Sequence, residues 1–117
     1  MLAKKSLDGH VESILLSLLN KNPNYGYRIV RELNELAPEV LKMGEGTVYP
    51  VLHRMEERGM LKGVWEENKK NRPRKYYHVT RKGKRHMSQA RQQWIELQKL
   101  MRSVFEDEQP NVQGKLA

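Results

Sequence analysis

The basic residues of this 117-residue chain are gathered in one segment. Residues 62–86 hold ten of its 22 lysines and arginines and only two of its 14 acidic residues, so they account for the whole net charge of +8. A basic excess confined to a short segment is typical of a surface that binds a polyanion such as nucleic acid. The side-chain chemistry therefore predicts phosphate contacts.

The cations cluster around a predicted β-hairpin. Residues 60–65 and 75–79 have strand composition, and the polar residues 66–74 between them are too many for a two-residue turn. We expect the tip of this hairpin to contact DNA phosphates or the minor groove. The cations in question are Lys69, Lys70, Arg72, Arg74 and Lys75. An exposed run of charge can also be a merely solvated surface, and the sequence leaves that alternative open.

A predicted helix before the hairpin offers a second set of contacts. One side of it is apolar at the spacing of a buried face, with Val48, Val51, Leu52 and Met55. Its outer face and flanks carry groups that can enter a DNA major groove, namely Gly46, Thr47, Tyr49, Pro50, His53 and Arg54. Arg54 is suited to a guanine edge. We expect Pro50 in or just after the first turn, where its missing N–H costs little. The alternative is an ordinary amphipathic helix with a solvated outer face.

Two further helices are expected before this one. Apolar residues within 11–19 follow helical spacing, with Ser6 or Asp8 as a cap and Asn22-Pro23 as the stop. The next helix covers about residues 25–36. Glycines 44 and 46 then lead into the third helix, which ends at Gly59.

A long helix is predicted from Thr80, which has the side chain of a helix cap. Arg81 and Lys82 follow in its first turn, where cations oppose the helix dipole at a cost of about 0.3–1 kcal/mol each. An external phosphate near this helix start would offset that cost. The mutation of both residues to Glu is therefore expected to stabilise the fold slightly and to weaken DNA binding.

The same helix carries a heptad seam that needs a partner helix. Its members are Met87, Ala90, Trp94, Leu97, Met101 and Val104. The seam predicts a two-fold dimer, which would place two recognition helices about one DNA turn, or a multiple of it, apart. Trp94 is an unusually large side chain for its position in the seam. Its simplest role is to pack the dimer interface.

The predicted fold is mainly α with a small β-hairpin: a winged helix-turn-helix over residues 1–79, with the wing at about 60–79. A dimerisation helix over 80–105 and a disordered tail over 106–117 complete the chain. The segments 25–29, 46–61 and 74–77, with Thr80 and Gly83, resemble the PadR family of bacterial transcription regulators, in its small subfamily with a single C-terminal helix.

The resemblance implies a homodimer on a palindromic operator, usually a repressor that a small molecule releases. It places Tyr49, His53 and Arg54 in the DNA-contacting helix. It places Tyr27 at the start of the supporting helix, where it either touches phosphate or packs in the core. Trp94 matches a tryptophan that stacks flat aromatic ligands in multidrug-sensing relatives. Arg81 and Lys82 depart from the family, which commonly has acidic residues there.

Other classes of protein fit the sequence poorly. The absence of cysteine excludes disulfides and thiolate metal sites. No nucleophile with a nearby base and no phosphate-binding loop is present, so neither an enzyme nor a cofactor is expected. The four histidines lie in different predicted elements, which argues against a metal sensor. No apolar run approaches the roughly 20 residues that span a bilayer, so we expect a cytoplasmic protein. The remaining alternative is a winged helix used for protein association or for non-specific nucleic-acid binding.

Overall fold

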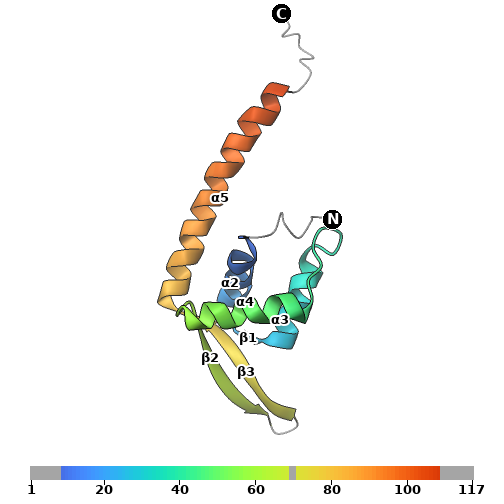
Figure 1. The fold of residues 1–117 in the computed structure, drawn as a ribbon, viewed down its shortest axis with the longest axis vertical. Coiled ribbons are helices and arrows are strands. Elements are labelled where there is room, and N and C mark those ends of the chain that lie inside the picture. The colour runs from blue at the N-terminus through green and yellow to red at the C-terminus, as the bar shows by residue number, and fades with distance from the viewer. Residues whose placement is uncertain (1–8, 69–70, 109–117) are drawn as a thin grey trace, which may run out of the picture.

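The computed structural model describes residues 9–68 and 71–108. Within them the elements follow the order α2 (Val11–Lys21), β1 (Asn24–Tyr25), α3 (Gly26–Leu36), α4 (Glu45–Glu57), β2 (Leu61–Asn68), β3 (Asn71–Val79) and α5 (Arg81–Glu108) (Figure 1). This arrangement confirms the predicted mainly helical fold with a β-hairpin wing. The suggested caps Ser6 and Asp8, the wing lysines Lys69 and Lys70, and the tail beyond residue 108 lie outside the described residues.

A single apolar core joins α2, α3 and α4. Leu15, Leu19, Ile29 and Leu33 are buried at the helical spacing that the sequence predicted. The predicted inner face of α4 is also buried in full, with Val48, Val51, Leu52 and Met55. Since this face is fixed against the core, the opposite face of α4 must point to solvent.

The turn between α3 and α4 is fastened by one side chain. The Asn34 amide donates to the carbonyl of Met43 at 2.6 Å, and its oxygen accepts from the Met43 N–H at 2.6 Å. Leu41 and Met43 are buried in the core. These contacts satisfy backbone groups that a loop would otherwise leave unpaired, and they fix how α4 is presented beside α3.

Helix α4 begins earlier than the sequence indicated. It has Glu45 as its first residue, so Gly46 lies in the first turn and Pro50, the sixth residue, lies in the second. This agrees with the prediction that Pro50 lies in or just after the first turn, and only the carbonyl of Gly46 lacks its helical N–H donor as a result. The other end is as predicted, because Gly59 has the positive φ of 78° that suits a glycine just after a helix.

The sheet differs from the predicted hairpin in two ways. A two-residue strand, β1, adds to it in the antiparallel order β1-β3-β2, with Tyr25 opposite Tyr76. The strands of the wing also extend to Asn68 and from Asn71, so the prediction of a long loop over 66–74 was wrong. Polar strand residues are tolerated because this part of the wing projects into solvent (Figure 1). Pro73 fits because the register shifts between Glu66 and Asn68, where the ladder is irregular.

Helix α5 projects away from the body of the domain (Figure 1). Its 28 residues end at Glu108, three residues beyond the predicted end at 105. The predicted cap is confirmed, since the Gly83 N–H donates to the Thr80 hydroxyl at 3.1 Å. The same hydroxyl donates to the carbonyl of Gly59 at 2.6 Å, which joins the start of α5 to the end of α4.

Candidate nucleic-acid interface

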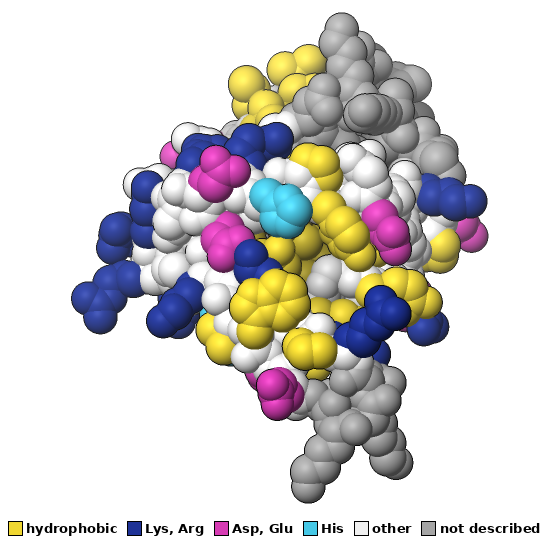
Figure 2. Space-filling view, turned by 60° about the horizontal axis from the view of Figure 1, so that its bottom comes forward, with side chains coloured by type: hydrophobic (Ala, Val, Ile, Leu, Met, Phe, Trp, Pro, Cys, Tyr) yellow, Lys and Arg dark blue, Asp and Glu magenta, His cyan; other side chains and the backbone are white. Residues whose placement is uncertain are grey.

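The outer face of α4 is open to solvent over its whole length. Gly46, Pro50, His53 and Arg54 are exposed, and Thr47 on the flank is half-buried. Figure 2 brings forward the underside of the view in Figure 1. On it, most Lys and Arg side chains lie toward the margins, and apolar side chains, a histidine and several Asp or Glu side chains lie between them. Cations near the margins of this face can contact phosphates, and the side chains between them can contact base edges in a DNA groove.

Tyr49 of α4 and Tyr27 of α3 differ in how far they are exposed. Tyr49 is half-buried, and its ring lies so close to Gly26 that a Cβ there would come within 2.8 Å of Cε1. Burial, and secondarily the charge of Glu45, raises the pKa of the Tyr49 hydroxyl. Tyr27 is 54% exposed, so the alternative of core packing is wrong for this residue. Tyr49 helps to fix α4 on α3, whereas the side chain of Tyr27 is available to a ligand.

The wing holds some of its cations in intramolecular contacts. Arg72 is exposed. The Arg74 guanidinium lies over the ring of Tyr25, 4.2 Å from its centroid, and this ring meets Tyr76 edge-on at 5.4 Å. Arg74 is therefore positioned along the sheet by a cation–π contact.

Lys75 joins the wing to α4. Its Nζ donates to Glu56 Oε1 at 2.6 Å, and both side chains are more than two thirds buried. This hydrogen bond raises the Lys75 pKa, against an opposing effect of burial. The pair crosses Gly63, where a Cβ would collide with the Lys75 side chain and lie 2.8 Å from Glu56 Oε2. Sequence reasoning placed Lys75 among the phosphate contacts and missed Glu56, since nothing local connects two residues 19 positions apart.

The cations at the start of α5 also separate into two environments. Arg81 is exposed. Lys82 donates from Nζ to the carbonyl of Arg58 at 2.6 Å, at the C-terminal end of α4. A cation at a helix C-terminus is favourable, so α4 supplies an internal partner that the sequence did not indicate. An external phosphate is not required to explain Lys82.

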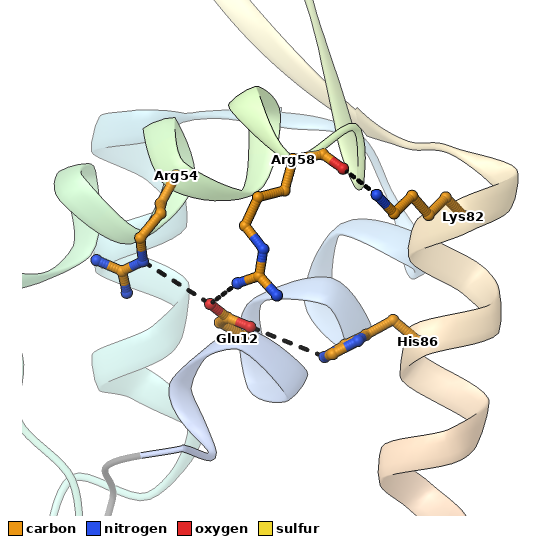
Figure 3. Close-up of polar contacts among 5 residues, drawn as sticks. All are labelled: Glu12, Arg54, Arg58, Lys82 and His86. Carbon is orange, nitrogen blue, oxygen red and sulfur yellow. Dashed lines mark hydrogen bonds and ion pairs between the residues drawn. The ribbon is translucent and has the colours of Figure 1, made fainter.

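A carboxylate lies between α4 and the two helices behind it. Glu12 of α2 accepts a hydrogen bond from Arg58 at 3.1 Å and lies 3.9 Å from Arg54 (Figure 3). His86 of α5 approaches its other oxygen at 3.8 Å. This histidine does meet an acid, but the remaining neighbours are cations. Among residues 9–68 and 71–108, no group of three or more metal-binding side chains comes together.

The predicted seam of α5 is largely uncovered. The exposed fractions are 54% for Trp94, 48% for Leu97, 39% for Met101 and 45% for Val104. Met87 and Ala90 are half-buried and, with Trp94 and Leu97, line a groove of about 690 Å³ against α2. Leu100 and Phe105, which the heptad pattern omitted, are also more than half exposed. In the described part of the chain, no helix is both long and apolar enough to cross a membrane.

A basic wing beside an exposed helix of a helix-turn-helix defines a winged-helix DNA-binding protein. The model of the transcriptional regulator PadR-like family matches residues 15–89, and the chain belongs to this family. It is thus a DNA-binding transcriptional regulator and not an enzyme, as the sequence predicted.

Solved structures agree with this assignment. A transcriptional regulator from Clostridium thermocellum is 27% identical, with a TM-score of 0.79 over 88% of this chain and 97% of that one. A PadR-like regulator from Bacillus cereus is 26% identical, with a TM-score of 0.77 over 87% and 97% of the two chains. A PadR-like transcription factor from Bacteroides fragilis is 31% identical, with a TM-score of 0.73 over 86% and 94%.

Proposed function

We propose that this regulator recognises a specific palindromic operator by inserting α4 into the major groove. The observation that carries the proposal is the exposed outer face of α4, with His53 and Arg54 in its C-terminal half, beside the basic wing. Arg54 pairs with a base edge, and His53, Thr47 and Tyr27 contact bases or the adjoining phosphates. Arg72, Arg74 and Arg81, with the wing lysines 69 and 70, supply sequence-independent affinity. Lys75 serves first to hold the wing.

The active form is a homodimer built on α5. Its exposed apolar side chains, from Trp94 to Phe105, form a surface that a single copy leaves in water. A second copy of α5 covers this surface without burying a charged side chain of the seam, because the seam residues are uncharged. The two-fold axis then places one recognition helix on each half of a palindrome, about 34 Å or a multiple of it apart.

The groove beside Trp94 is the site for a small apolar effector. It lies between α2 and α5, so an occupant would touch both the domain body and the dimerisation helix. A flat aromatic compound suits it, since Trp94 offers a large exposed ring for stacking and Met87 can adapt its shape. We infer that binding there releases a repressor from DNA.

Fluorescence anisotropy with DNA from upstream of the protein's own gene tests the recognition. A scrambled fragment of equal length is the control, over about 50–300 mM salt. We expect tight, salt-dependent binding that prefers the native fragment, and loss of much of this preference in Arg54→Ala. Equal, weak binding to both fragments would overturn sequence-specific regulation and would favour a general nucleic-acid binder or a wing that binds an acidic protein.

The effector site is tested separately by tryptophan fluorescence. A Trp65→Phe background removes the other emitter, so that quenching by flat aromatic compounds reports on Trp94 alone. Quenching that saturates, together with release of labelled DNA, is the expected result. The absence of quenching across a chemically diverse set would refute the effector site and leave Trp94 as an interface residue.

A further inference from the structure

Glu12 lies where three helices meet behind the recognition face. It belongs to α2, Arg54 and Arg58 come from α4, and His86 comes from α5 (Figure 3). The Glu12 side chain is 20% exposed, whereas both arginine side chains are more than half exposed. A mostly buried carboxylate thus contacts Nε of Arg54 and a terminal nitrogen of Arg58, and much of both arginine side chains remains in solvent.

The contact to Arg54 leaves the groups that DNA needs uncommitted. Glu12 Oε2 faces Nε of Arg54 at 3.9 Å, so this contact is made through Nε and not through the two terminal nitrogens of the guanidinium (Figure 3). A guanine edge can be contacted by a pair of parallel N–H donors of this kind. The carboxylate can therefore restrain the Arg54 side chain without competing for its terminal donors.

The arrangement is poorly explained as a source of stability alone. Ion pairs with more than half of one partner exposed contribute little to folding. Restraint of a long side chain has a larger effect on binding, because a preorganised Arg loses less rotamer freedom when it contacts a base. The nearby Arg58 supplies the shorter contact, at 3.1 Å, and this contact helps to hold the Glu12 carboxylate beside Arg54.

We propose that Glu12 is a positioning residue that sets the DNA specificity of Arg54. The inference rests on the proposed function, in which Arg54 contacts a base. The carboxylate has two opposite effects on DNA binding. It positions Arg54 for contact with a base, and its negative charge repels phosphates near α4. Removal of the charge should therefore raise affinity for any DNA and lower the preference for the operator.

Three variants of the full chain separate these consequences. Glu12→Gln removes the charge and should reduce the ratio of operator to scrambled-DNA affinity by about three- to tenfold, a fraction of what one base contact contributes. Glu12→Asp keeps the charge but withdraws it by one methylene, so it should reduce the ratio without raising affinity for scrambled DNA. Glu39→Gln, an exposed residue in the turn after α3, is the matched charge control and should leave the ratio unchanged.

The Arg54→Ala background shows whether Glu12 acts through Arg54. We expect Glu12→Gln to lower the ratio in the parent protein and to have no such effect once Arg54 is absent. A reduced ratio in Arg54→Ala with an unchanged ratio in Glu12→Gln and Glu12→Asp would overturn the positioning role and leave the proposed function standing. An unchanged ratio in Arg54→Ala itself would instead refute the base contact on which both depend. A ratio that falls equally in both backgrounds would also overturn the inference, since Glu12 would then act elsewhere.

Discussion

The replacement of Gly83 by alanine tests the joint between α4 and α5. Gly83 is buried in the first turn of α5, and an added Cβ would lie 2.3 Å from the carbonyl oxygen of Met60 and 2.9 Å from Val79 Cγ1. Ordinary contacts of this kind are about 3.5 Å, so the helix start must move by about 1 Å. The obstacle is backbone, so no rotamer change removes it.

The expected change in the free energy of unfolding is the sum of two costs and one gain. Overpacking of this kind costs about 1–3 kcal/mol. Displacement also weakens the hydrogen bond from the Thr80 N–H to the same Met60 oxygen, now 3.1 Å, at about 0.5–1.5 kcal/mol. Alanine recovers about 1 kcal/mol of helix propensity. We therefore expect Gly83→Ala to reduce the free energy of unfolding by about 0.5–3.5 kcal/mol, and the Tm by about 2–14 °C.

Gly46→Ala is the matched control for this prediction. Gly46 also lies in the first turn of a helix, but an added Cβ there meets nothing within 4 Å. The same chemical change should stabilise α4 by up to about 1 kcal/mol. Thermal unfolding of both variants by circular dichroism makes the comparison. Equal shifts in Tm of the same sign would refute the argument, because they would show that local packing at Gly83 has no effect.

Three further predictions concern the dimer, pH and the wing. Leu97→Glu places a charge on the exposed face of α5 and should give monomers in sedimentation experiments at concentrations where the parent protein is dimeric; a persistent dimer would contradict the role of this face. Burial raises the pKa of Tyr77 from 10.0, and the hydrogen bond between Lys75 and Glu56 raises the pKa of Lys75 from 10.5. Both groups keep their protons more firmly in the folded state, so the stability that they contribute is present below pH 10 and is lost as the pH rises through their folded pKa values. Urea unfolding between about pH 9 and 11.5 should show this decline, and Tyr77→Phe should flatten it. Glu56→Gln should lower the free energy of unfolding at neutral pH by about 1 kcal/mol, and an unchanged value would show that the pair with Lys75 does not hold the wing.

The spacing of apolar residues along the sequence predicted most of the fold. The inner faces of α2, α3 and α4 are visible in the sequence because each places apolar side chains at helical spacing, and most of these side chains are buried. Leu36, which the same spacing placed on the inner face of α3, is instead 56% exposed. Gly59 and Thr80 marked the joint between α4 and α5 through their own local chemistry. Local signals of this kind fail for β1, since two residues are too short to show any alternation.

The candidate site was less predictable than the fold because its contacts join distant parts of the chain. Glu12 lies 46 residues from its partner Arg58, and neither residue carries a pattern that identifies the other. The same holds for Lys82, whose partner is a backbone carbonyl that becomes available only where α4 ends. The sequence shows where the basic residues are concentrated, and the structure shows which of them have intramolecular partners.

Because the start of α5 is joined to the end of α4 near Gly59 and Thr80, a small rotation at this joint moves the far end of α5 a long way. Two hydrogen bonds, from Thr80 to Gly59 and from Lys82 to Arg58, attach the base of this helix directly to the end of the recognition helix. With 28 residues at 1.5 Å each, α5 is about 42 Å long, so a tilt of about 5° at its base displaces its far end by about 4 Å. Conversely, a small shift in how two such helices cross would rotate each recognition helix by the same angle. In the proposed dimer, the distance between the two surfaces that contact DNA would then depend on how the α5 helices cross, far from the DNA.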